Sequence, residues 1–213
     1  MRLYYIYDAL CGWCYGFSPV IQEFCKTHKD DFKAEVISGG MITGNRIGPI
    51  GEVAGYISEA YKVVEDRTGV KFGEGFLNGI LAEGTAIFTS IPSAIAMSIL
   101  KQEQPEAQIA FAAALQNSIY DTGIKPKDLD AYADLLASFG LDREEALIKM
   151  NQKEYREAAE ADFKFAASLG VSGFPTLVLK HNDKYYAIAK GYISLTDLEL
   201  NYEHFKKNVL NKS

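Results

Sequence analysis

The sequence predicts an α/β fold in which a βαβ unit and a ββα unit flank a long helical block. Segments with strand character lie near the two ends of the 213-residue chain, whereas residues 53–169 have helical periodicity and no strand pattern. Two strand-bearing pieces on either side of a helical piece indicate one mixed fold with a helical insertion. We therefore expect residues 1–52 and 170–213 to form one domain and residues 53–169 to form the inserted domain.

The first unit is expected to begin with a buried strand at residues 2–8, which are largely aromatic and aliphatic. A helix over residues 12–29 follows, and Pro19 is expected to kink it. A second strand at 34–38 completes the βαβ unit. The glycine-rich segment from 39 to 51 lacks a phosphate-binding pattern, so we expect a flexible connection at the rim of the site.

The central block is expected to contain helices separated by prolines and glycines, which end helices or start turns. Their expected ranges are 53–67, 91–103, 106–121, 127–138, 142–150 and 153–169. Gly170 ends the last of them. Two strands at 176–180 and 185–190 and a closing helix at 195–209 then form the ββα unit.

Composition and charge exclude several classes of partner. The net charge is −6 and the pI is near 5.2, which argues against nucleic acid and anionic membrane surfaces as partners. The longest apolar stretches are far shorter than the roughly 20 residues that span a bilayer. Because the first strand begins at residue 2, we expect no secretory leader and a cytoplasmic location. Three cysteines are too few for a multi-disulfide scaffold.

The chemistry is expected at residues 11–14, Cys11-Gly12-Trp13-Cys14, where the first strand gives way to the first helix. Two thiols with this spacing can close into a disulfide and reopen. The unpaired N–H groups and the dipole at a helix N-terminus stabilise the thiolate of Cys11 more than that of Cys14. We expect an exposed Cys11 as nucleophile and a shielded Cys14 as resolving thiol. The two sulfurs carry the electrons, so this chemistry requires no cofactor.

A metal site is the main alternative for the cysteines, because Cys11, Cys14, Cys25 and His28 have the spacing C-x2-C-x10-C-x2-H. If residues 12–29 are helical, however, Cys11 and Cys25 lie about 21 Å apart along the helix axis. They cannot then share one ion, and we expect no metal. Cys25 is expected to be a core residue of the first helix, and His28 a surface residue near the end of that helix. A further alternative is that the thiols are inert.

The two cysteines are combined with Pro19 in the same helix and with Pro175 at the start of a later strand. This combination resembles the DsbA-like branch of the thioredoxin superfamily, and it extends over essentially the whole chain. Residues 8–15 are similar to the cytoplasmic FrnE-like subgroup, which favours an aspartate before the motif and a tryptophan within it. The resemblance implies a thioredoxin-like fold with a large helical insertion and a dithiol–disulfide oxidoreductase or isomerase activity.

The resemblance also implies a substrate-binding region around the thiols. A cis bond before Pro175 would hold the backbone of Phe174 against Cys11, where it can pair with an extended substrate. Trp13, with Gly12 beside it, is expected to be exposed next to the thiols as an apolar lip. The expected partner is a protein or small molecule that carries a thiol or a disulfide. The sequence does not determine the oligomeric state.

Two positions depart from the family pattern. DsbA carries an imidazole between its cysteines, where this chain has Gly12-Trp13, and many relatives carry a buried acid where this chain has Tyr5. Both changes remove groups that tune thiolate stability or proton transfer, so the direction of electron flow stays open. Asp8 is expected either to cap the turn before the helix or to act near the thiols.

Two other functions are compatible with the same residues. Relatives of this fold include glutathione-dependent isomerases and kappa-type glutathione transferases, in which the residue at the position of Cys11 activates glutathione. Glutathione is therefore a candidate co-substrate, although that chemistry has no use for Cys14. The third hypothesis is a binding module that captures peptides on a surface of Trp13 and Phe174 without catalysis.

Overall fold

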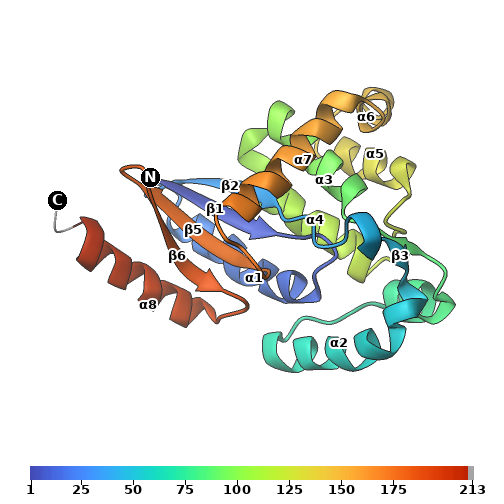
Figure 1. The fold of residues 1–213 in the computed structure, drawn as a ribbon, viewed down its shortest axis with the longest axis horizontal. Helices are drawn as coiled ribbons and strands as arrows, with labels where there is room; N and C mark the ends of the chain where they lie inside the picture. Colours follow the sequence, from blue (N-terminus) through green and yellow to red (C-terminus); the bar gives the residue numbers. More distant parts are fainter. Residues whose placement is uncertain (211–213) are drawn as a thin grey trace.

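A computed structural model describes residues 1–210, which form a four-stranded mixed sheet with helices on both faces (Figure 1). The strand order is β2-β1-β5-β6. Strand β1 (Arg2–Tyr7) is parallel to β2 (Lys33–Ser38) and antiparallel to β5 (Thr176–His181), which pairs in turn with β6 (Lys184–Lys190). The βαβ and ββα units expected at the two ends of the chain are thus joined in one sheet.

Strand β1 is the centre of this sheet because its side chains alternate between two apolar environments. Leu3, Tyr5 and Tyr7 belong to the large core that includes helix α1 (Gly12–Thr27). The intervening Tyr4 and Ile6 belong to a smaller cluster on the other face, which includes residues of helix α7 (Lys153–Ser168). All of β1 after Arg2 is buried, so its C-terminal end is a rigid base for the residues that follow.

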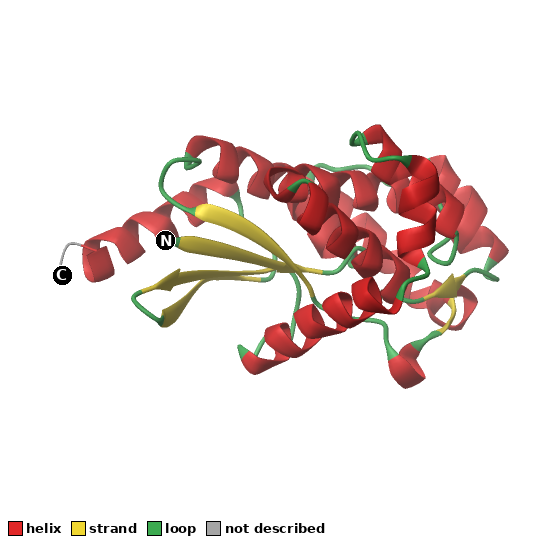
Figure 2. Ribbon diagram, turned by 90° about the horizontal axis from the view of Figure 1, so that it is seen from above, coloured by secondary structure: helices red, strands yellow, loops and turns green. Residues whose placement is uncertain are grey.

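The helical block contains the six expected helices, each within two residues of its expected bounds. They are α2 (Ala54–Thr68), α3 (Ile91–Glu103), α4 (Gln108–Tyr120), α5 (Leu129–Ser138), α6 (Arg143–Met150) and α7. Figure 2 shows most of them gathered beyond one end of the sheet. The closing helix α8 (Leu195–Phe205) lies along β6 and α1. Helix α1 continues through Pro19, which is exposed on its surface.

The block also contains two elements that the sequence did not predict, a short strand and a π-helical segment. A two-stranded antiparallel sheet joins β3 (Gly48–Pro49) to β4 (Ile87–Phe88), and a π-helical segment spans Gly75–Leu81. Two residues are too short for a strand to show any alternation, so the pattern could not reveal β4. The glycine-rich segment also contains short 3-10 helices at Gly44–Arg46 and Ile50–Val53. No helix within residues 1–210 is long and apolar enough to cross a bilayer.

Candidate active site

The pairing of β1 with β5 brings the two predicted parts of the site together. Ile6 lies opposite Thr176 in antiparallel register, so the segment after β1 runs beside the segment before β5. The peptide bond between Phe174 and Pro175 is cis, as expected. The thiol of Cys11 lies against this bond and donates a hydrogen bond to the Phe174 carbonyl at 3.6 Å.

Cys11 is the N-cap of helix α1, with extended backbone, and its sulfur accepts a hydrogen bond from the Cys14 N–H at 3.4 Å. The Cys11 carbonyl accepts the N–H of Tyr15 and so begins the helix. N-terminal amides and the helix dipole favour negative charge at an N-cap position. The Cys11 sulfur thus lies among the N-terminal amides of α1, and the helix starts where the sequence predicted it.

The two thiols, both free in this structure, differ in their surroundings. Cys14 is fully buried, and this burial raises the pKa of its thiol well above the ordinary value, with a further contribution from its contact with Cys11. Cys11 is only 6% exposed, so it is far less exposed than expected. Cys11 is thus largely covered by neighbouring segments, and it lines a cavity.

That cavity has a volume of about 570 Å³ and lies between the start of α1, the segment 41–50 and helix α2. Gly12 and Trp13 line it together with Cys11. Trp13 is half-buried and not exposed as expected, because its ring packs near Tyr192 with ring centroids 6.2 Å apart. The predicted apolar lip is thus part of a cavity wall.

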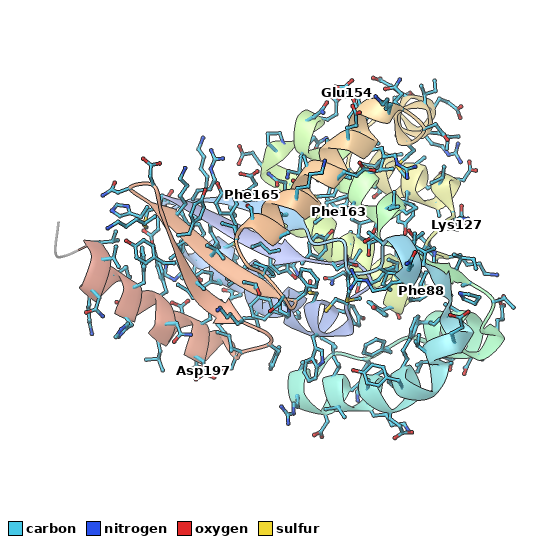
Figure 3. The ribbon with its side chains drawn as sticks, in the orientation of Figure 1. Phe88, Lys127, Glu154, Phe163, Phe165 and Asp197 are labelled. Atoms are coloured by element: carbon cyan, nitrogen blue, oxygen red, sulfur yellow. The ribbon has the colours of Figure 1, made fainter. Side chains whose placement is uncertain are left out.

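Phe174 contributes its backbone to the site, but its side chain turns away. A Cβ atom on Gly39 would lie 2.1 Å from the Phe174 ring, so the absence of a side chain at Gly39 makes room for that ring. The neighbouring Gly40 likewise makes room for the ring of Phe163 on α7, labelled in Figure 3. Phe174 also lines a separate cavity of about 330 Å³, whereas Pro175 is buried at the start of β5.

Asp8 connects three segments of the site through one buried carboxylate. It accepts hydrogen bonds from the Leu10 N–H at 3.0 Å, the Met41 N–H at 2.7 Å and the Ser90 hydroxyl at 3.0 Å. Burial raises the pKa of Asp8, and these hydrogen bonds oppose the rise. Asp8 therefore caps the turn before α1, which was one of its two expected roles. It also anchors residues that are distant in sequence.

Tyr5 lies under the motif, against Cys14. Its side chain is fully buried, and its hydroxyl has no partner with hydrogen-bond geometry within residues 1–210. Burial and the proximity of Cys14 raise the pKa of this hydroxyl well above the ordinary value. Tyr5 is thus a neutral group beside the Cys14 thiol, whereas an acid at this position would introduce a charge.

The other candidate ligands of a metal lie apart from the thiols. Helix α1 runs unbroken between Cys11 and Cys25, and residues 1–210 contain no cluster of three or more His, Cys, Asp or Glu that could hold an ion. Cys25 is half-buried, and burial raises the pKa of its thiol to about 12. His28 is not a free surface residue, because its ring contacts Asp31 at 2.9 Å and Glu199 at 2.8 Å.

Several residues of the site were not predicted from the sequence. They come from α2, from the segment 41–50, from β4 and from the region 72–76 and the end of α4, and they complete the cavity. Phe88 of β4, labelled in Figure 3, is one of them. The others that matter most are Met41, Ile42, Ile57, Tyr61 and Phe72. Their apolar character gives no local signal, because core residues have the same composition.

Comparisons with known proteins agree with this geometry. The family described as a DSBA-like thioredoxin domain matches residues 3–203. A candidate protein disulfide isomerase from Nitrosomonas europaea is similar with a TM-score of 0.87, 24% identity and 98% of both chains covered. The cytosolic disulfide reductase DsbM from Pseudomonas aeruginosa has a TM-score of 0.78, 25% identity and 100% of both chains covered.

A second DsbM structure, which contains GSH, has 24% identity and the same TM-score of 0.78, and the match covers 97% of this chain and 100% of that one. A comparison with curated protein sequences found no match.

Proposed function

Because this chain belongs to the DSBA-like thioredoxin-domain family, we propose that it is a thiol–disulfide oxidoreductase acting through Cys11 and Cys14. The observation that carries the proposal is the difference between the two sulfurs. Cys11 caps a helix and faces a cavity, whereas Cys14 is enclosed one turn further along. One sulfur can therefore meet a substrate while the other waits to resolve the product.

In the proposed reaction, the thiolate of Cys11 attacks one sulfur of a substrate disulfide and forms a mixed disulfide. The displaced thiolate takes up a proton and leaves. Cys14 then loses its proton, attacks the Cys11 sulfur and releases the second substrate thiol, so that two electrons pass to the substrate. The reverse sequence oxidises a substrate dithiol. The raised pKa of Cys14 fits this order, because Cys14 stays protonated until the mixed disulfide has formed.

The surrounding residues have proposed roles in binding the substrate. Gly12 and Trp13 form the wall beside Cys11, and the backbone of Phe174, fixed by Pro175, aligns the substrate chain next to the sulfur. DsbM is named a cytosolic disulfide reductase, and one of its structures contains GSH. We therefore propose a cytoplasmic location and a thiol or disulfide, glutathione included, as co-substrate.

The division of the chain belongs to the same proposal. Residues 1–52 and 170–213 would form the thioredoxin-like domain that carries both sulfurs, and residues 53–169 would form the inserted domain. The inserted part supplies α2 and therefore one wall of the cavity. Substrate choice would then depend on the insertion, while the chemistry depends on the other domain.

Single cysteine variants test the function in a reduction assay with the small disulfide hydroxyethyl disulfide as substrate and dithiothreitol as the electron source. Cys11→Ser is expected to reduce the rate to the uncatalysed background, because no nucleophile faces the cavity. Cys14→Ser, reduced and then freed of dithiothreitol before the disulfide is added, is expected to accumulate a mixed disulfide at Cys11, visible as a mass increase of one substrate arm. Cys25→Ser is the matched control and should keep the wild-type rate. Normal turnover by Cys11→Ser would refute the proposal.

A further inference from the structure

The cavity beside Cys11 has walls that are not needed for thiol–disulfide exchange itself. Its lining is mostly apolar, and the only charged residues among its lining within residues 1–210 are Arg46 and Glu52. Both are exposed. The other polar groups of the lining are neutral, namely the Asn45 amide and the tyrosine hydroxyls, whereas a site for a multiply charged thiol would place several charged side chains around the ligand.

Helix α2 supplies one of these walls and has few other partners for its apolar residues. The structure describes all fifteen residues of α2, and only Val64 among them is buried. Helices of this length normally bury an apolar stripe against the body of the protein. Ile57 and Tyr61 of α2 line the cavity and are partly buried. Figure 1 shows α2 set apart from the other helices of the block.

Exposed apolar residues continue from the cavity onto the surface at its mouth. Val53 is 50% exposed and Tyr56 is 75% exposed, and both belong to the lining. Large side chains that remain apolar and exposed next to a cavity commonly mark a binding site. One lining thus contains these exposed apolar residues, the partly buried residues of α2 and Cys11.

The size of the cavity limits what can enter it. A volume of about 570 Å³ falls within the range of roughly 300–1,000 Å³ that is typical of small-molecule sites. Cys11 is only 6% exposed, so a substrate sulfur must enter the cavity to reach it. A disulfide within a folded protein cannot enter, whereas a slender arm that ends in an apolar group can.

We propose that this cavity binds the apolar arm of a low-molecular-weight disulfide, and this inference rests on the proposed function. The arm is an aromatic or branched alkyl group a few bonds from the sulfur. Cys11 attacks that sulfur, one arm leaves as a free thiol, and Cys14 then displaces the second arm. In a single turnover the dithiol of the protein supplies both electrons, and Cys11 and Cys14 end as a disulfide.

The test is a comparison of two disulfides that differ only in the arm. Dibenzoylcystamine and diacetylcystamine release thiols of similar acidity, so their intrinsic reactivities are close. Reduced protein is mixed with each disulfide in single turnovers, and each rate is divided by the rate with free dithiothreitol. We expect this enhancement to be about tenfold or more greater for the benzoyl compound, because the ring is removed from water.

Two substitutions in α2 locate the preference. Ile57→Ser places a hydroxyl in the cavity wall and should lower the benzoyl-to-acetyl ratio severalfold. Val63→Ser is the matched control, because Val63 is 45% exposed on the same helix and lies outside the lining. That control should keep both rates and their ratio. A ratio that falls equally in both variants would assign the effect to the helix and overturn the inference.

The remaining outcomes separate the inference from the function on which it rests. Equal enhancements for the two cystamines, or a greater enhancement for oxidised glutathione, would overturn the apolar arm and leave the oxidoreductase proposal intact. A greater enhancement for a disulfide-linked peptide dimer with apolar flanking residues would assign the cavity to peptides instead. Failure to reduce any of these disulfides would refute the proposed function itself.

Discussion

At the scale of single residues, Asp8 holds the site together because its carboxylate joins segments that are far apart in sequence. One oxygen accepts hydrogen bonds from Leu10 and from Ser90, which is 82 positions away, and the other accepts the N–H of Met41. All of these groups are donors, so an acceptor-only side chain is required there. Asparagine has one amide N–H₂ group in place of a carboxylate oxygen, so some of these donors would face another donor and lose their acceptor.

We therefore predict that Asp8→Asn lowers the free energy of unfolding by about 1–3 kcal/mol, the usual loss when buried donors are left without acceptors. Urea unfolding, followed by the fluorescence of Trp13, the single tryptophan, measures the change. Asp66→Asn is the control, because Asp66 is exposed on α2. An Asp8→Asn variant as stable as this control would show that the hydrogen bonds do not hold the segments together.

The sequence predicts which residues lie at the centre of the candidate site but not their surroundings. The position of Cys11 and Cys14 after the first strand is a local pattern and correctly predicted the helix start, whereas the cis bond before Pro175 was predicted from the family resemblance. The half-buried state of Trp13 depends on Tyr192, which only the folded sheet brings near. The partners of Asp8 depend likewise on loops whose paths have no local signal.

At the scale of elements, helices α1 and α2 approach each other closely at Gly16. A Cβ atom on Gly16 would lie 2.7 Å from Cγ2 of Thr68 and 3.0 Å from Cγ1 of Val64. Glycine therefore lets α2 lie close to α1, next to the cavity that both helices line. Gly55, at the start of α2, has no atoms within 4 Å of the place where its Cβ would be.

These two glycines predict opposite effects of the same substitution. Gly16→Ala should lower the free energy of unfolding by about 1–3 kcal/mol, because the added methyl group overpacks the contact between the helices. Gly55→Ala should raise it by about 0.5–1 kcal/mol, because alanine favours a helix and meets no neighbour. Urea unfolding of both variants checks the signs. Equal effects would mean that α1 and α2 do not pack closely at Gly16.

The periodicity of the sequence predicted the long helices and strands, whereas it did not predict the short ones. Helix α7 and strand β1 have enough residues for their pattern to determine type and approximate bounds. Strands β3 and β4 consist of two residues each and exist because their segments meet in the fold. The π-helical segment at Gly75–Leu81 depends on tight contacts of Gly73 and Gly75 with residues 121–122, which no periodicity encodes.

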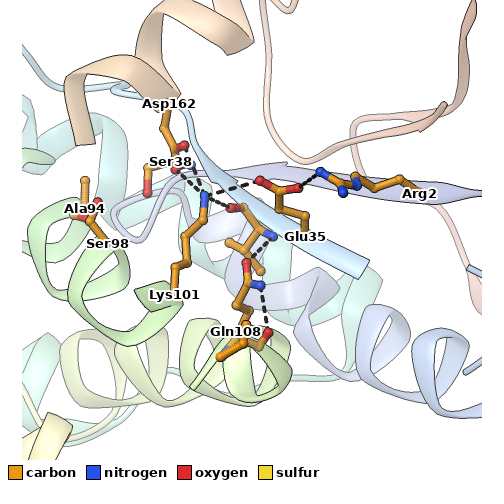
Figure 4. A network of polar contacts seen from close by, with 10 residues as sticks. Arg2, Glu35, Ser38, Ala94, Ser98, Lys101, Gln108 and Asp162 are labelled. Atoms are coloured by element: carbon orange, nitrogen blue, oxygen red, sulfur yellow. Dashed lines mark hydrogen bonds and ion pairs between the residues drawn. The ribbon is translucent and has the colours of Figure 1, made fainter. Parts of the chain in front are cut away.

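At the scale of the whole molecule, the helical block covers an open edge of the sheet. Strand β2 pairs only with β1, so one side of its backbone has no strand partner. Side chains of the block satisfy that side: Gln108 accepts the Val36 N–H at 2.9 Å, and Asp162 accepts the Ser38 N–H at 3.1 Å. Lys101 donates to the Val36 carbonyl at 2.9 Å, as Figure 4 shows.

Lys101 and Asp162 form the ionic part of this network. The Lys101 ammonium lies 3.1 Å from both carboxylate oxygens of Asp162, and both side chains are largely buried. Burial raises the pKa of Asp162, and Lys101 opposes the rise. Removing the ammonium would leave a buried carboxylate without its cation, which is more costly than removing both partners.

We predict that Lys101→Met lowers the free energy of unfolding by about 3 kcal/mol at neutral pH. Without Lys101 the pKa of Asp162 in the folded state rises further above its unfolded value. A folded state that binds the proton more tightly than the unfolded state gains stability as pH falls toward the unfolded pKa. The difference in free energy of unfolding between wild type and Lys101→Met should therefore become smaller as the pH falls from neutral to about 4.5. Urea unfolding measures it.

Two controls connect this result to the edge of the sheet. Lys62→Met removes an exposed partner of Glu59 and should change stability by less than about 0.5 kcal/mol at either pH. The double variant Lys101→Met/Asp162→Leu also removes the carboxylate that Lys101 faces, so it should recover part of the lost stability. The difference in free energy of unfolding between wild type and this double variant should not narrow as the pH falls. A gap that stays constant with pH in Lys101→Met would mean that the loss comes from the Val36 hydrogen bond and not from Asp162.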